Sequence, residues 1–349
     1  MIETVLGPIP AERLGVTSMH DHVLSDASRL RRDGAEPGPT ADRVVPETLG
    51  YLRWNMLALA DNLRLDEPGV AVAELTRAVA LGQRALVEST SWGLGPDHAG
   101  LPDVARRSGM TIVCSYGAYL RSTLPGWIAD LDEAGLEEHL AGALLDRVPG
   151  TGYRAGLLGI MGTTADLPEA ERAMLRAAAR AAVRAGAAVT VRLDPEAFRG
   201  PEVLALCAAE GLPAERVVFT NADEYLDAGY WADLAAAGAV LEMCYGTEAG
   251  HTGRVHNPSD GERLDFFARF CAEHPASRHV LGESLWTKAQ LRTYGGYGYG
   301  YLLERIIPAL LAAGVPAGRL DRMLVAEPRR ILDRAGGGGY GIHSEEEST

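Results

Sequence analysis

Eight short apolar runs alternate along the chain with longer stretches rich in Ala, Leu, Arg and Glu. Each run is almost continuously apolar, which is typical of a strand buried on both faces in a parallel sheet. The stretches between them are long enough for crossover helices, predicted most clearly over Ala170–Ala185 and also over Glu224–Ala237 and Pro258–Glu273. The predicted strands are Leu14–Met19, Arg84–Thr90, Met110–Tyr116, Ala155–Gly162, Ala187–Leu193, Glu215–Asn221, Ala239–Tyr245 and Arg278–Ser284.

Eight strand–helix units in one chain favour a closed (β/α)₈ barrel, also called a TIM barrel, over an open doubly wound sheet. No glycine-rich dinucleotide fingerprint follows the first strand, which weakens the case for the open sheet. We therefore predict a single barrel domain over residues 1–334. The remaining segment, 335–349, is glycine-rich and then acidic, so we expect a flexible tail.

Composition narrows the classes of partner. The formal net charge is −14, and the acidic and basic residues are interspersed without a basic stripe, which argues against nucleic acid or an anionic membrane. No apolar run reaches the roughly 18 residues of a membrane helix, and the N-terminus has no secretory pattern. The four cysteines form no metal-type pair, so we expect reduced thiols and a cytoplasmic protein. The oligomeric state stays open, with a homodimer as one possibility.

The first predicted strand ends in the sequence Met19-His20-Asp21-His22. Side chains alternate along a strand, so His20 and His22 point to the same face. At the C-terminal mouth of a barrel, that face is the interior, where active sites lie. Two imidazoles placed in this way can hold one metal ion between them, or they can simply form hydrogen bonds.

Longer stretches around these histidines resemble a known family. LGVTSMHDHVLSD, LVESTSWGLGPD and GMTIVCSYGAYL are similar to the opening of phosphotriesterase-family proteins, which belong to the amidohydrolase superfamily. The closing stretches LWTKAQLRTYGGYGYGYLLERIIPALLAAGV and LVAEPRRIL are the more specific half. The resemblance spans about residues 3–334. It implies the barrel fold, a small-molecule site at the strand C-termini and divalent metals.

The resemblance also implies six metal-ligand positions, of which His20 and His22 keep the family residue. The four other positions have changed: they hold Ile160, Arg192, Asn221 and Ser284. Isoleucine has no ligand atom, arginine stays protonated and repels a cation, and asparagine and serine bind zinc poorly. Glu283 replaces the lost aspartate only if the strand register slips by one residue. We therefore predict a degenerate metal site without a binuclear centre.

The function that we expect first is metal-independent acid–base chemistry on a small anionic or carbonyl-bearing substrate: elimination, cyclisation, isomerisation or ester cleavage. Its candidate catalytic residues are His20, His22, Arg192 and Asp223. The histidines titrate near neutrality, and a guanidinium can clamp an anion or stabilise an oxyanion. The resemblance implies that Asp223 is the aspartate that the family keeps beside its metal-bound water. Alternatively, Arg192 only fills the old metal space, paired with Asp194, Asp223 or Glu242.

Polar and aromatic residues near the strand ends are candidates for substrate contact. They are Asn221, Tyr116, Trp92, Glu242, His251, His256, Ser284 and Trp286. Loops at this face of a barrel set specificity, although buried aromatic residues more often serve packing.

Two other interpretations remain open. One is a hydrolase of esters, lactones or phosphotriesters that uses a single zinc ion on His20 and His22. The other is a non-catalytic binding protein on an inherited barrel, because a fold does not fix a function. The first interpretation requires no cofactor.

Overall fold

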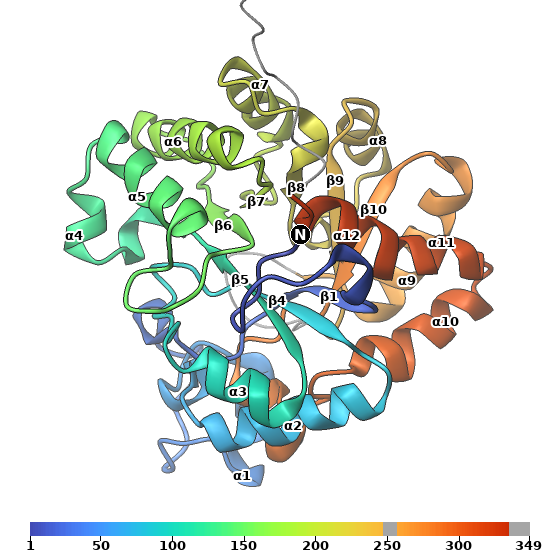
Figure 1. The fold of residues 1–349 in the computed structure, drawn as a ribbon. Helices are drawn as coiled ribbons and strands as arrows, with labels where there is room; N and C mark the ends of the chain where they lie inside the picture. The colour runs from blue at the N-terminus through green and yellow to red at the C-terminus, as the bar shows by residue number, and fades with distance from the viewer. Residues whose placement is uncertain (247–256, 335–349) are drawn as a thin grey trace, which may run out of the picture.

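The computed structural model describes residues 1–246 and 257–334. Eight parallel strands form one sheet in chain order, and the helices surround them (Figure 1). The strands are β1 Thr17–Asp21, β4 Ala85–Glu88, β5 Thr111–Tyr116, β6 Leu157–Gly162, β7 Val189–Arg192, β8 Val217–Phe219, β9 Val240–Cys244 and β10 Arg278–Gly282. This arrangement confirms the predicted TIM barrel and the order of its strands.

The seam of the barrel lies at the two histidines. The backbone oxygen of His20 accepts the N–H of Ser284 at 2.8 Å, and the N–H of His22 donates to the oxygen of Leu285 at 2.9 Å. These bonds join the end of β1 to the segment after β10, so the barrel is nearly closed. The backbone that closes the barrel is also the backbone that positions the two imidazoles.

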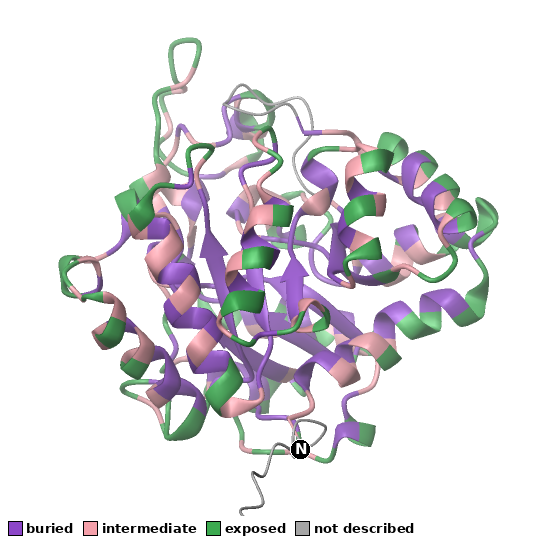
Figure 2. Ribbon diagram, turned by 90° about the horizontal axis from the view of Figure 1, so that it is seen from above, coloured by how far each residue is buried: buried purple, intermediate pink, exposed green. Residues whose placement is uncertain are grey.

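Helices cover the outside of the sheet, with their exposed residues facing outward and the strands buried at the centre (Figure 2). A short antiparallel ribbon, β2 Ser25–Asp26 with β3 Arg64–Leu65, belongs to the long segment between β1 and α2. The helices are α1 Pro46–Trp54, α2 Pro68–Ala80, α3 Leu101–Ser108, α4 Gly126–Ala129, α5 Glu133–Leu145, α6 Glu169–Ala185, α7 Gly200–Ala209, α8 Ala228–Ala236, α9 Asp260–Glu273, α10 Ile307–Ala312, α11 Ala317–Asp321 and α12 Glu327–Leu332.

Branched apolar side chains fill the barrel interior at the N-terminal end of the strands. One buried cluster takes members from strands all around it, including Val87, Val113, Val218 and Val280. A larger cluster lies between the strands and the helices. This end of the barrel interior is packed with apolar side chains. The polar side chains of the interior lie at the opposite, C-terminal end, where active sites of this fold lie.

The predicted helix limits hold for α6 and α9 but not for α8. Helix α8 begins at Ala228, because the side chain of Asp227 caps it by accepting the N–H of Tyr230 at 2.8 Å. Glu224, which we expected to begin this helix, instead belongs to a separate 3₁₀ turn after β8, Ala222–Glu224. This turn changes the directions of Asp223 and Glu224. Within the described ranges, no helix has the length and apolar character needed to cross a membrane.

Candidate active site

The two predicted histidines face each other at the C-terminal mouth of β1. Nε2 of His20 lies 3.3 Å from Nε2 of His22, and both side chains are buried. Their rings meet edge to face, with centroids 5.2 Å apart. We call these two side chains the histidine pair.

A hydroxyl and a carboxylate fix the ring of His22 from behind. Its Nδ1 lies 3.0 Å from Oγ1 of Thr90, and the Thr90 hydroxyl donates a short hydrogen bond to Glu88. Since the hydroxyl proton is used for Glu88, its oxygen accepts from His22, which puts the ring proton on Nδ1. Burial raises the pKa of Glu88 to about 7, and burial, assisted by His20, holds the pKa of His22 well below its usual range.

A second group of the same kind fixes His20. Its Nδ1 lies 2.5 Å from Oγ1 of Thr220 and 3.1 Å from Oε2 of Glu242, and Thr220 also donates to Glu242. The sulfur of Cys244 lies 3.8 Å from the same nitrogen. The carboxylate of Glu242 therefore assigns the ring proton of His20 to Nδ1 as well.

With both ring protons on Nδ1, the two Nε2 atoms present lone pairs to each other. At 3.3 Å, these lone pairs repel unless a cation lies between them. A single proton shared by the two rings satisfies this geometry. The geometry thus accommodates one cation or one proton between the two Nε2 atoms, while burial favours the uncharged form of His22 and lowers its pKa.

Arg192, at the end of β7, forms an ion pair with Glu224. Its Nη2 lies 2.5 and 2.6 Å from the two carboxylate oxygens. We expected Asp223, Asp194 or Glu242 as the partner. The expectation of Asp223 was wrong, because the 3₁₀ turn brings the next residue, Glu224, to the guanidinium. The side chain of Arg192 keeps 20% of its surface exposed, so the ion pair is open to the solvent on one side.

Asp223 points away from the histidine pair, toward the helix layer. Its carboxylate lies 2.7 Å from Nε of Arg263 on α9 and accepts the N–H of Cys244 at 2.8 Å, and both charged side chains are fully buried. Burial raises the pKa of Asp223 to about 6, although Arg263 favours its charged form. These contacts are structural, so the geometry gives no support to the catalytic role predicted for Asp223.

Two of the replaced family positions contact each other. Nδ2 of Asn221 donates to Oγ of Ser284 at 3.2 Å, and Asn221 directly follows Thr220, the partner of His20. Ile160 instead belongs to a buried apolar cluster with Tyr119 and Leu94, against which Trp286 packs. The mouth thus has a polar side next to the histidine pair and an apolar side around Ile160.

Unfavourable backbone conformations occur at the same, C-terminal end of the barrel. Among the described residues, the non-glycine residues with positive φ are Leu167, Phe198, Asn221 and Ser284. All of them follow the C-terminal ends of strands, and two of them occupy former ligand positions. Such conformations are costly and are retained where the surrounding structure needs them, most often at functional sites.

The other predicted residues divide into two groups. Tyr116 and Trp92 contact each other, with a 2.8 Å hydrogen bond, and Tyr116 also bonds to His139 of the helix layer at 2.6 Å. Their role in substrate binding stays a prediction, as does that of Trp286. His251 and His256 lie outside the described residues.

Glu283 binds neither histidine in this structure. Its carboxylate accepts the N–H groups of Gly300, at 2.9 Å, and Leu302, at 3.0 Å, as expected for a side chain that alternates out of the barrel. It therefore does not replace the aspartate that the family has at the next position.

The residues present do not fit the binuclear metal centre of the family. Ile160 offers no bridging ligand, and the charge of Arg192 opposes a second cation. A single ion between the Nε2 atoms fits better, because two nitrogen ligands of a tetrahedral zinc ion lie about 3.3 Å apart. In the described part of the chain, however, the grouping of three potential ligands includes His20, Glu242 and Cys244 but not His22.

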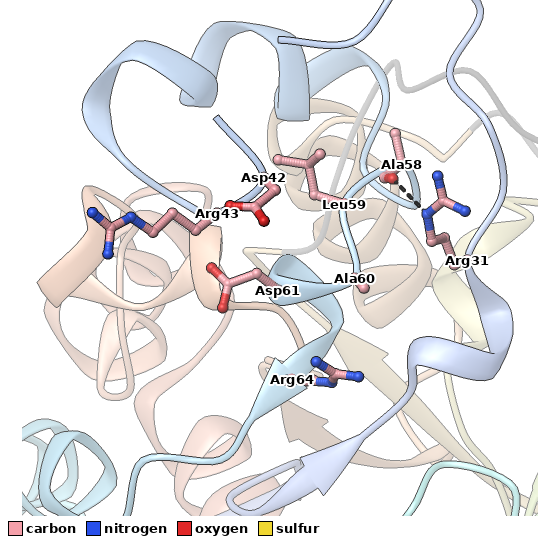
Figure 3. Close-up of a pocket in the computed structure, with 8 residues that line it drawn as sticks. All are labelled: Arg31, Asp42, Arg43, Ala58, Leu59, Ala60, Asp61 and Arg64. Carbon is pink, nitrogen blue, oxygen red and sulfur yellow. Dashed lines mark hydrogen bonds between the residues drawn. The ribbon is translucent and has the colours of Figure 1, made fainter. Parts of the chain in front are cut away.

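A separate surface pocket of about 410 Å³ lies in the segment between β1 and α2 (Figure 3). Its charged groups have partners nearby: Arg31 donates to the oxygen of Ala58 at 3.0 Å, Arg64 pairs with Asp26, and Asp61 pairs with Lys288. None of the predicted site residues lines this pocket. It is therefore distinct from the site at the barrel mouth.

Sequence reasoning missed the residues that orient the site, namely Thr90, Thr220 and Glu224. Thr90 and Thr220 stand at the ends of predicted strands, where a polar residue after an apolar run points to the mouth. That signal was present but was not used. The role of Glu224 depends on the 3₁₀ turn, which the sequence pattern did not predict.

Comparisons with known proteins agree with this geometry. An N-acetyltaurine hydrolase from Tetraodon nigroviridis is 27% identical over 343 residues, which cover 95% of this chain and 97% of the relative. A resiniferatoxin-binding protein from Rhodobacter sphaeroides has 32% identity and a TM-score of 0.88, covering 97% of this chain and 96% of its own. A lactonase from Listeria monocytogenes, with 19% identity and a TM-score of 0.75 over 95% of this chain and 98% of its own, shares the fold.

The relatives named hydrolases confirm the prediction of a hydrolase-type enzyme. The model of the phosphotriesterase family matches residues 1–332. With the barrel, the histidine pair and this match together, the chain belongs to the phosphotriesterase family.

Proposed function

We propose that this protein hydrolyses a small anionic substrate at an amide, ester or lactone carbonyl, with the histidine pair as its acid–base group. The observation that carries the proposal is the 3.3 Å approach of the two Nε2 atoms, each ring held from behind by a hydroxyl and a carboxylate. The hydrolase names of the relatives, and not this geometry, favour hydrolysis over the elimination, cyclisation and isomerisation that the sequence left open.

The proton path follows from the tautomers. Water attacks the carbonyl carbon, and its proton passes to Nε2 of the histidine pair, where the two rings share it. The bond from the carbonyl carbon to the leaving nitrogen or oxygen then breaks, and the same proton passes to the leaving atom. Asn221 and Ser284 lie beside this point and supply N–H and O–H donors for the carbonyl oxygen.

Arg192 selects the charge of the substrate. Its guanidinium is partly exposed, and a carboxylate or sulfonate can bind to the donors that face the solvent. N-acetyltaurine, the substrate in the name of the relatives, combines an amide with a sulfonate. Such an anionic amide fits both halves of the proposed site.

A second candidate is hydrolysis assisted by one divalent ion, favoured by the same 3.3 Å separation of the Nε2 atoms. His20 and His22 would hold the ion, which would polarise water or the carbonyl oxygen. The two candidates differ in metal content, so elemental analysis separates them.

The proposal also includes a reduced, cytoplasmic environment. All four cysteines are buried and unpaired, which is compatible with that setting.

Hydrolysis assays of N-acetyltaurine, N-acetyl amino acids and lactones test the proposal. We expect His20→Asn and His22→Asn each to lower kcat/KM at least about 100-fold. His274→Asn is the matched control, because His274 is a partly buried histidine at the C-terminal end of α9 in the helix layer, where it stacks on Phe270. No hydrolysis of any of these substrates by the wild type, or equal loss in the control, would contradict the proposal.

A further inference from the structure

We propose that Phe198 and Tyr225 form an aromatic rim beside Arg192, which binds the apolar or aromatic body of the anionic substrate. The proposal rests on the proposed function and adds a substrate class to it. The predicted ligand is an elongated carboxylate or sulfonate with a flat apolar group at the end away from the histidine pair.

The aromatic rim consists of two large side chains that the fold leaves in the solvent. Phe198 is 40% exposed and Tyr225 is 38% exposed, and their ring centroids lie 4.8 Å apart in an edge-to-face arrangement. Tyr230 supports Phe198 from the other side, with centroids 5.0 Å apart. Exposed apolar groups that gather at one place, beside polar groups, mark binding surfaces.

The backbone of Phe198 is held at an unfavourable angle. Its φ is +52°, in the left-handed region that bulky residues rarely adopt and that glycine adopts without cost. The phenylalanine therefore keeps this position despite the cost to its backbone. A function of the ring explains why it stands there.

One short segment, 220–225, contributes a contact to each part of the proposed site. Thr220 touches His20, Glu224 pairs with Arg192, and Tyr225 packs on Phe198. A substrate bound along this segment would reach the histidine pair with its carbonyl, Arg192 with its anionic group and the aromatic rim with its apolar body.

The guanidinium of Arg192 also has N–H donors, beyond those that bind Glu224, for the anionic group of the substrate. Within residues 1–246 and 257–334, the hydrogen bonds found for its side chain all use Nη2 and all go to Glu224. Nε and Nη1 provide further donors in the fixed geometry of the guanidinium. Arg192 is the last residue of β7, Phe198 lies in the loop that follows it, and Tyr225 lies in the segment after β8, so we expect the aromatic rim and these donors to act on the same ligand.

Binding of 4-phenylbutyrate and butyrate, measured by calorimetry, tests the proposal. The two anions differ in the phenyl ring. We expect the wild type to bind 4-phenylbutyrate about tenfold more tightly, which corresponds to about 1.4 kcal/mol. Phe198→Gly removes the ring and relieves the backbone, so it should reduce the ratio to nearly one without lowering Tm. Tyr225→Ala should reduce the ratio as well.

Two controls make the test specific. Arg192→Met should weaken both anions to the same degree, and Leu311→Ala, which truncates a side chain 45% exposed on α10, should leave the ratio unchanged. An unchanged ratio in Phe198→Gly, or no preference for the phenyl compound in the wild type, would overturn the proposal. Because binding is measured without turnover, a protein that hydrolyses nothing but keeps the ratio would contradict the proposed function alone.

Discussion

Arg192 places a permanent positive charge, paired with Glu224, at the mouth of the barrel. The resemblance to the family implies a metal-binding histidine at this position. We propose that the arginine supplies part of the charge that a metal ion would supply. The paired glutamate is 9% exposed, so removing the arginine leaves a nearly buried carboxylate without its main partner.

We expect Arg192→Met to raise KM for anionic substrates about 30-fold, because the lost charge-assisted hydrogen bonds are worth about 2 kcal/mol or more. Neutral substrates should be affected much less. Steady-state kinetics on matched anionic and neutral amides measures the difference. Arg77→Met, which removes a partly buried ion pair with Glu304 in the helix layer, is the control. Equal effects on both substrates would show that Arg192 has only a structural role.

Single residues also show the limit of sequence reasoning. Alternation along the first strand predicted that His20 and His22 point to the same face, and their Nε2 atoms lie 3.3 Å apart, because strand parity is a local property. The partner of Arg192 was predicted incorrectly, since it depends on the 3₁₀ turn that follows β8. The same turn directs the side chain of Asp223 away from the histidine pair. Loop conformation at the strand ends, which sequence patterns determine weakly, decided these contacts.

At the scale of elements, the buried pair of Asp223 and Arg263 fastens the turn after β8 to α9. We expect Asp223→Asn to destabilise the protein by about 3–5 kcal/mol, because the fully buried guanidinium of Arg263 loses the carboxylate at 2.7 Å and keeps the longer contact with Asp260 at 3.3 Å. Chemical denaturation measures this change. The double variant Asp223→Asn/Arg263→Met should recover part of the loss. A large fall in kcat at unchanged stability would instead give Asp223 the catalytic role that the sequence first indicated.

Glu283 connects the end of β10 to Gly300 and to Leu302, the first residue of the helical segment Leu302–Ile306, and its charge should make stability depend on pH. Burial raises the pKa of Glu283 from its usual value of 4.5 to about 7. Between these values the folded protein binds more protons than the unfolded chain, so stability falls as pH rises through this window. We expect Tm to fall from pH 5 to pH 8 and Glu283→Gln to reduce the slope. Glu304→Gln, which changes a partly exposed glutamate, should leave the slope of Tm against pH unchanged. An equal slope in the wild type and in both variants would refute this expectation.

At the scale of the whole molecule, the barrel is the part that the sequence predicted best. Eight apolar runs with helical stretches between them leave few alternatives, because the parallel strands need crossover helices and both faces must be buried. The limits of the strands were predicted less accurately, because residues at the strand ends contribute to the site as well as to the sheet. The barrel thus persists while the chemistry of its mouth changes with a few side chains.

In the proposed function, the histidine pair works as an acid–base group in place of a binuclear metal centre. Hydrolysis measured before and after chelation, with metal content determined on the same samples, tests this role. We expect kcat/KM to stay within about twofold when bound zinc, manganese and cobalt fall well below one equivalent per chain. Activity that disappears on chelation and returns in proportion to one equivalent of metal, with the ion bound by His20 and His22, would contradict it.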